Sequence, residues 1–211
     1  MAERKIIINV GRQLGSGGRA IGKLLAEEFG CTFFDKEILN LAAKESGFSE
    51  SFFEQHDERK RFFRTLFHLH TQHLSDNNFY INKFSEESLF QFQAEAILKA
   101  SESGNCVFVG RCADYILRDN RDAINIFITG DLKERATQVM RRHGCDYEAA
   151  LKIISTKEAN RASYYNYFTG KKWGHCESYD FSINSTPLGI EGSARLIAQY
   201  IRQRLEQRDK A

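Results

Sequence analysis

The chain has 211 residues, of which 42% are hydrophobic and 27% charged, and its formal net charge is +2. This near-neutral charge argues against general nucleic-acid binding. No run approaches the roughly 20 apolar residues of a membrane span, and the five residues before the first apolar run are too few for a signal peptide. We therefore expect a globular, cytoplasmic protein of one domain over residues 1–211, with homo-oligomerisation left open.

The cysteines favour reduced thiols over disulfides. There are five of them, an odd number, and no two form a Cys-x-x-Cys pair. We expect them to pack as small apolar residues. They are Cys31, Cys106, Cys112, Cys145 and Cys176.

The first predicted elements are a strand, a glycine-rich loop and a helix. The run Ile6–Val10 is apolar and β-branched, which predicts a buried strand. A loop over 11–19 follows, and apolar residues from Ile21 to Phe29 then recur at helical spacing up to Gly30. Glycines with a helix N-terminus form a typical phosphate-binding arrangement.

This loop departs from a Walker A motif after its last glycine. A Walker A loop continues with Lys and then Ser or Thr. Here Gly18, Arg19 and Ala20 stand at those positions. The loop therefore predicts phosphate binding without establishing catalysis.

The next elements carry a carboxylate to the edge of the predicted sheet. Residues 31–34 predict a short strand that ends at Asp35, where ligands sit in open α/β sheets. Residues 36–46 and 86–102 predict helices, and 48–84 are interpreted as a helical insertion. His68, His70 and His73 within it are assigned to the surface, because helical spacing turns their side chains apart.

The second half of the chain continues to alternate strands and helices. Residues 106–109, 124–128 and 179–184 predict strands, and the first of them runs into Gly110-Arg111. Asp131, with Glu134 as a capping-box partner, predicts a helix that ends near Gly144. Further helices are expected over 146–168 and 189–207, with 146–175 as a lid-like segment. The alternation predicts a three-layer α/β/α sandwich around a mostly parallel, five-stranded sheet.

Basic side chains follow these elements. Arg111 is placed to bind a phosphate or carboxylate, or equally to pair with Asp114. Others lie on two predicted helices and are either ligand-binding or solvated. They are Arg135, Arg141, Arg142, Lys157 and Arg161.

Taken together, these features resemble the cytidylate kinase-like branch of the P-loop nucleoside monophosphate kinases. The resemblance rests on Gly15–Arg19, the Asp35 strand end and residues 106–142, and it extends over 161–173 and 179–189. It covers nearly the whole chain except 48–84. The family's Gly-Arg-Asp is matched by Gly110 and Arg111, but Cys112 replaces the acidic residue.

The resemblance implies a P-loop kinase fold, ATP as donor and Mg²⁺ without a clear protein ligand. It also assigns roles. The donor phosphates would lie on Gly15, Ser16, Gly17, Gly18 and Arg19, and the donor base near Arg135. Asp35 and Arg111 would bind the acceptor nucleotide, and Lys157 and Arg161 would approach the transferred phosphoryl group. Arg19 is then the candidate for the missing lysine charge, which makes Arg19, Lys157 and Arg161 the expected catalytic residues.

Two other functions remain open. Gly11-x-x-x-Gly15-x-Gly17 and Tyr167-x-x-x-Lys171 have the spacing of short-chain dehydrogenases, although Gly170 suggests that the helix ends between that pair. A nucleotide-binding sensor or partner module without catalysis is the stronger competitor, because the P-loop lysine is absent. Our hypothesis is ATP-dependent phosphoryl transfer to a nucleoside monophosphate, with CMP as the first acceptor to test.

Overall fold

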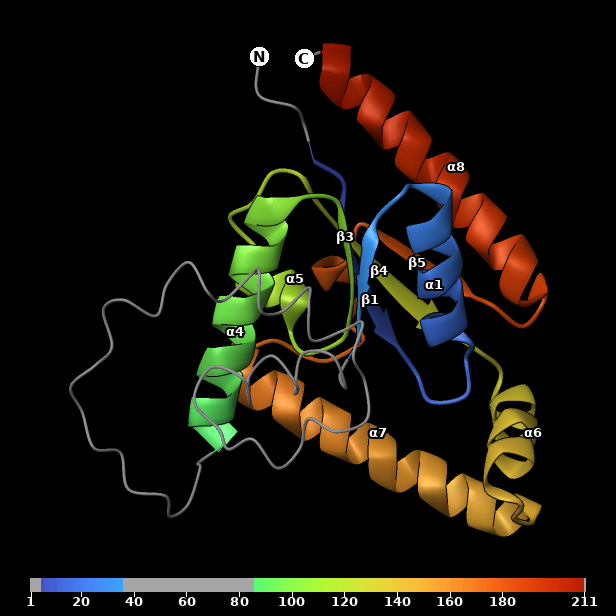
Figure 1. Cartoon of the computed structure of the whole chain (residues 1–211). Helices are drawn as coiled ribbons and strands as arrows, with labels where there is room; N and C mark the ends of the chain where they lie inside the picture. The colour runs from blue at the N-terminus through green and yellow to red at the C-terminus, as the bar shows by residue number, and fades with distance from the viewer. Residues whose placement is uncertain (1–4, 36–85, 211) are drawn as a thin grey trace, which may run out of the picture. The chain divides into compact units, whose positions relative to one another are not determined.

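Five strands form one parallel sheet in the order β2-β3-β1-β4-β5 (Figure 1). The computed structural model describes residues 5–35 and 86–210. The strands are β1 (Ile7–Arg12), β2 (Thr32–Phe34), β3 (Cys106–Val109), β4 (Ala123–Thr129) and β5 (Phe181–Asn184). All four pairings between neighbours are parallel, which confirms the predicted α/β class.

The described helices follow the predicted pattern, apart from two short elements that were not predicted. They are α1 (Gly18–Glu28), α4 (Glu86–Ser103), α5 (Ala113–Ile116), α6 (Leu132–His143), α7 (Tyr147–Thr169) and α8 (Gly189–Lys210). The sequence pattern did not predict α5 or the 3₁₀ turn at Cys176–Ser178, because both are too short to show a period. The helix expected over 36–46, the insertion over 48–84 and its three histidines lie outside the described residues. None of the described helices is both long and apolar enough to cross a membrane.

The chain divides into two units. Met1–Asp35 with Gly104–Ala211 contains the whole sheet, and Lys36–Ser103 contains α4. Every feature of the site described below belongs to the first unit.

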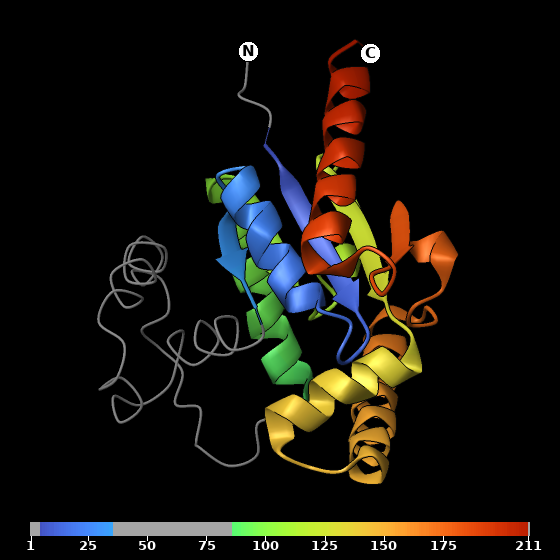
Figure 2. The same ribbon diagram turned by 90° about the vertical axis from the view of Figure 1, so that its right-hand side faces the viewer.

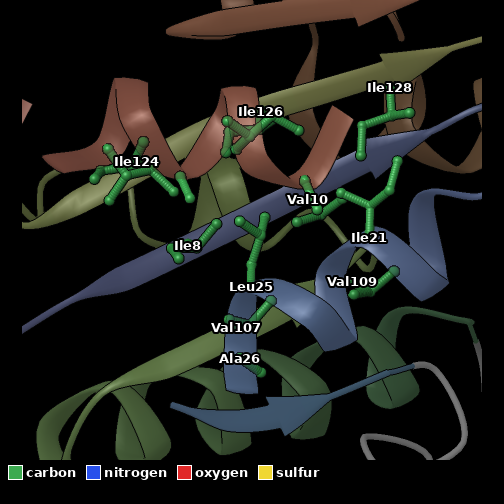
Figure 3. Close-up of a cluster of buried hydrophobic side chains, with 14 residues drawn as sticks. Ile8, Val10, Ile21, Leu25, Ala26, Val107, Val109, Ile124, Ile126 and Ile128 are labelled. Atoms are coloured by element: carbon green, nitrogen blue, oxygen red, sulfur yellow. The ribbon is translucent and has the colours of Figure 1, made fainter. Parts of the chain in front are cut away.

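The hydrophobic core of the sheet unit lies under α1 and α8. These two helices lie side by side against one face of the sheet (Figure 2). Ile8, Val10 and Ile126 are each at most 1% exposed, and they pack with Ile21 of α1 (Figure 3). Ile197 of α8 belongs to the same buried cluster. Burying each such side chain stabilises the folded state by about 1.5–3 kcal/mol. Packing in this layer therefore holds α1 against the sheet.

The opposite face is covered by α5 and by aromatic residues. The Phe127 ring lies 5.5 Å from Trp173 and 4.8 Å from Tyr179. The Tyr165 hydroxyl of α7 donates a 2.6 Å hydrogen bond to Asp114 of α5. Helical elements therefore lie on both faces, as a three-layer α/β/α sandwich requires.

Two local expectations are corrected by the structure. The loop expected from residue 11 begins later, because β1 stays paired with β4 as far as Arg12 opposite Ile128. The capping box of α6 does not form, since the Asp131 carboxylate makes no cap and accepts instead from the Asn184 amide at 2.7 Å. The first correction matters for function, because it makes Arg12 the last residue of the central strand.

The strand order determines where a ligand can bind. β1 lies between β3 and β4, and the connections from β1 and β3 leave the carboxyl edge toward different parts of the sheet. Such a divergence opens a crevice at the carboxyl ends of the strands, which is where open α/β sheets bind ligands.

Candidate functional site

The glycine-rich loop joins β1 to α1 and has the geometry of an anion-binding turn. Gly15 and Gly17 have φ angles of +81° and +75°, which glycine adopts without strain. A Cβ at Gly15 would lie 2.5 Å from the Arg135 carbonyl oxygen, so no other residue fits there. The first N–H groups of α1 have no partner within the helix, and they are available to a phosphate group.

A cavity of about 290 Å³ lies over this loop. Its size is at the lower end of the range for small-molecule sites, about 300–1,000 Å³. Its lining includes the loop from Gln13 to Ala20, the start of α6 and the residues before α8. It also includes five arginines, which make it strongly basic: Arg12, Arg19, Arg135, Arg142 and Arg161.

Arg19 joins the loop to the end of β2. Its guanidinium donates to Asp35 Oδ2 at 2.8 Å and lies 2.6 Å away through Nη2. Asp35 is buried, whereas half of the Arg19 side chain is exposed. The structure thus brings the expected donor-side cation and the expected acceptor-side carboxylate together as an ion pair.

Arg135 supports the loop from α6. Its guanidinium donates to the carbonyl oxygens of Gly130 and Leu14 and pairs with Glu158 at 2.6 Å. Glu158 also accepts from the Leu14 N–H at 3.1 Å. This network is nearly buried and fixes the loop against α6 and α7, while Arg135 still lines the cavity.

Arg161 and Lys157 of α7 differ in their positions. The Arg161 guanidinium donates to the Arg12 carbonyl oxygen at 3.1 Å and lines the cavity. Lys157 is exposed and is not part of the cavity lining. The structure therefore brings Arg161 to the loop and does not bring Lys157 there.

Arg111 stands on an unusual turn after β3. Gly110, Arg111 and Cys112 have consecutive positive φ angles of +81°, +59° and +56°. Such angles are costly for residues other than glycine and occur mainly at functional sites. The turn places the Arg111 guanidinium 5.2 Å from the Tyr164 ring centre. Asp114, its alternative partner, accepts a hydrogen bond from Tyr165 instead.

Arg12 is the residue that the sequence analysis did not assign to the site. It ends β1, lines the cavity and lies against Gly18 and Gly110. Burial, Arg161 and Arg111 lower the pKa of Arg12 to about 9, against the opposing effect of Asp35. The sequence predicted Arg12 to lie in the loop, between Gly11 and the phosphate-binding stretch that begins at Gly15, and no motif gave it a role there.

The residues around the loop do not suit a protein-held Mg²⁺. The position of the metal-binding hydroxyl in a Walker A loop is held by Arg19, which is paired with Asp35. The Ser16 hydroxyl donates to the Gln13 carbonyl at 3.0 Å. In the part of the chain that the structure describes, no group of three His, Cys, Asp or Glu side chains could hold a metal ion. We therefore assign no step to a metal held by this protein.

Comparison with known proteins identifies the family of the chain. The model of the cytidylate kinase-like family matches residues 7–187. The chain belongs to the cytidylate kinase-like family. At family level, its function is that of a nucleotide kinase.

Individual relatives are distant but nearly full-length. Cytidylate kinase of Pyrococcus horikoshii is 27% identical over 194 residues, covering 91% of this chain and 86% of that protein. Cytidylate kinase of Methanocaldococcus jannaschii is 25% identical, covering 93% of this chain and 97% of that protein.

Solved structures show the same fold. An uncharacterised protein from Eubacterium ventriosum is similar with a TM-score of 0.72 and 28% identity, covering 94% of this chain and 99% of that one. Shikimate kinase from Bacteroides thetaiotaomicron has a TM-score of 0.52 at 15% identity, covering 93% of this chain and 98% of that one. The latter likeness concerns the fold alone, and it agrees with the predicted P-loop kinase architecture.

Proposed function

We propose that this protein transfers the γ-phosphoryl group of ATP to a nucleoside monophosphate, and CMP is the acceptor to test first. The observation that carries the proposal is the arginine-lined cavity over the loop at the start of α1. The distant cytidylate kinases support the choice of CMP.

The chemistry of this reaction suits such a site. An oxygen of the acceptor phosphate attacks the γ-phosphorus, the bond to the β–γ bridging oxygen breaks, and ADP leaves. The attacking oxygen already carries negative charge near pH 7, since the second pKa of a phosphomonoester is about 6. The protein therefore needs no general base, and it must neutralise two anions that approach one another.

The named residues divide this task. Gly15 to Gly18 would hold the donor phosphates through backbone N–H groups, and Arg19 and Arg161 would stand beside them. Arg111 would bind the acceptor phosphate, with Asp35 and Arg19 joining the two sides. Arg135 would fix the loop next to the donor nucleotide, and Lys157 would approach only if α7 moved.

A panel assay tests this function. ADP release is measured with ATP and, in turn, CMP, dCMP, UMP, AMP and GMP. We expect turnover with CMP above the ATP-only background. Absence of turnover with every acceptor, together with calorimetric binding of ATP, would overturn the kinase proposal.

A nucleotide-binding protein without catalysis is the second candidate. It is favoured by Gly18 at the lysine position and by the engagement of Arg19 with Asp35. The dehydrogenase interpretation loses support, since the sheet order differs from the 3-2-1-4-5-6 order of the dinucleotide-binding fold. In addition, α7 ends at Thr169, between the Tyr and the Lys of the proposed pair.

A further inference from the structure

Arg12, at the end of β1, and Gly18, at the start of α1, both differ from the residues that a Walker A motif has at these positions. That motif is Gly-x-x-x-x-Gly-Lys-[Ser/Thr]. With Gly17 as the second glycine, the first glycine falls at Arg12 and the lysine at Gly18. A basic side chain is therefore absent at position 18, where the motif has lysine, and present at position 12, where the motif has glycine.

The structure shows that Arg12 and a side chain at position 18 are sterically incompatible. A Cβ at Gly18 would lie 2.5 Å from the Arg12 Cβ and 3.0 Å from its Cγ. Real Cβ atoms essentially never approach so closely, and neither atom is the flexible end of a side chain. Arg12 therefore occupies the space beside the loop that a side chain at position 18 would need.

The guanidinium of Arg12 extends from there toward β3. Its Cζ lies 3.1 Å from where a Cβ of Gly110 would be, directly before Arg111. Gly18 begins the helix behind the phosphate loop, and Arg111 is the expected acceptor ligand. Arg12 thus reaches from the donor side of the crevice to its acceptor side.

The charges around Arg12 favour an anionic ligand. No acceptor within residues 5–35 and 86–210 takes a hydrogen bond from its guanidinium. Arg161, Arg111 and Arg19 act on it with like charge, and Asp35 alone opposes them among its main electrostatic neighbours. With a pKa of about 9 the half-buried guanidinium stays protonated near pH 7, and an anionic ligand beside it would offset the surrounding positive charge that Asp35 opposes only in part.

Arg19 is less suited to that role. Its guanidinium is already engaged by the buried Asp35 carboxylate, and half of its side chain is exposed. Moving it onto a phosphate would leave Asp35 without this partner. Binding of a phosphoryl group by Arg12 breaks no hydrogen bond to a described residue.

We propose that Arg12 replaces the Walker A lysine and binds the phosphoryl group in transfer, between the loop and Arg111. This inference rests on the proposed kinase function. A guanidinium has a fork of N–H groups and can donate to two oxygens at once. It would hold the γ-phosphoryl group as the bond to the donor lengthens and the bond to the acceptor forms.

The proposal is tested by moving the positive charge from position 12 back to position 18. Arg12→Gly is compared with the double variant Arg12→Gly/Gly18→Lys, which rebuilds the common Walker A arrangement. We expect Arg12→Gly to lower kcat with ATP and CMP about 100- to 1,000-fold, as the loss of one transition-state donor does. The double variant should recover at least about tenfold of that loss, because it returns a cation to the site.

Matched variants separate this role from folding. Arg202→Ala removes an arginine that pairs with Glu28 at the far end of α1, and its kcat should equal that of the wild type. Gly18→Lys alone should unfold at a lower temperature, because its Cβ overlaps Arg12. If Arg12→Gly folds and retains kcat within about threefold while the wild type is active, the Arg12 inference fails and the kinase function stands.

A binding arm keeps the inference testable if the wild type proves inactive. Affinity for inorganic tripolyphosphate is measured by calorimetry for the wild type, Arg12→Gly and Arg202→Ala. A loss of at least about tenfold in Arg12→Gly alone, as for one charge-assisted contact, would support phosphate binding by Arg12 while the kinase proposal fails. Equal affinities of all three proteins would overturn the inference.

Discussion

Glu158 is the residue on which the support of the phosphate loop depends. It accepts from the Leu14 N–H and from the Arg135 guanidinium, and its side chain is only 19% exposed. Arg135 is 8% exposed, so its charge would remain buried if the carboxylate were removed. Breaking a buried pair from one side is costly because one charge stays uncompensated.

Glu158→Ala should therefore lower the free energy of unfolding by about 3 kcal/mol. Glu158→Gln keeps the side-chain volume and an acceptor for the Leu14 N–H but leaves the Arg135 charge uncompensated, so it should cost only somewhat less than the Ala variant. Urea unfolding followed by circular dichroism measures both. A Gln variant as stable as the wild type would contradict the role given to the charge and would leave volume and the hydrogen bond from the Leu14 N–H as the cause.

Asp114 provides a pH-dependent contribution to stability. Burial raises its pKa above the ordinary value of 3.8, although the hydrogen bond from Tyr165 opposes this shift. The native state therefore holds the proton to higher pH than the unfolded state does. Stability from this group is fully present below pH 3.8 and is lost as pH rises through the native pKa.

Asp114→Asn, which cannot ionise, should remove this dependence. We expect the free energy of unfolding of the variant, relative to the wild type, to increase as pH rises from 4 and then to level off. Urea titrations between about pH 4 and pH 8 measure the difference. A difference that does not change with pH would contradict the expected shift.

At the level of elements, the helix ends show how far sequence signals reach. Gly144 and Gly170 end α6 and α7 with positive φ angles, as glycine at those positions indicates. The Asp146 carboxylate caps α7 by accepting from the Ala149 N–H at 2.8 Å. Asp131 has the same signature, yet the neighbouring Asn184 takes its carboxylate, which no local pattern could reveal.

Asp146→Ala should destabilise the protein by about 1 kcal/mol, because α7 loses its capping acceptor. Asp146→Asn retains an acceptor oxygen and should stay within about 0.5 kcal/mol of the wild type. Thermal unfolding of the two variants compares them. A loss in the Asn variant as large as in the Ala variant would indicate that charge, and not the hydrogen bond, is responsible.

The same limit applies to the site. The glycine loop, the Asp35 strand end and the Gly110-Arg111 turn follow from local sequence, and the structure places them at one edge of the sheet. Arg12 meets Gly18 and Gly110 only in the folded chain, so no local sequence pattern could place it in the site. Lys157 and Arg161 share a predicted helix, and only the packing of α7 distinguishes them.

For the molecule as a whole, the strand order is what the sequence could not provide. Alternation of strands and helices indicated a parallel sheet, but it is compatible with several orders. The order found here places β1 between β3 and β4 and so unites segments about 100 residues apart. The family resemblance predicted a P-loop kinase fold with a five-stranded, mostly parallel sheet, and the order of the strands comes from the structure alone.

The cysteines give a test of the whole packed unit. Cys106 and Cys112 are buried, and burial raises the pKa of each thiol to about 12, whereas Cys176 is exposed. Only thiolates react rapidly with alkylating agents. Brief iodoacetamide treatment at pH 8, followed by mass spectrometry, should therefore label Cys176 well before Cys106 and Cys112. Equal labelling would mean that the sheet unit opens on that timescale.

The close approach of Arg12 to Gly18 also limits how such a loop can arise by mutation. A chain with Arg at position 12 and Lys at position 18 overlaps sterically, and a chain with Gly at both lacks the cation. If Arg12 has the proposed role, either single change away from a Walker A loop impairs phosphate binding, and only both changes together keep a cation at the site. The pair of residues at positions 12 and 18 would then indicate which of the two loop types a sequence has.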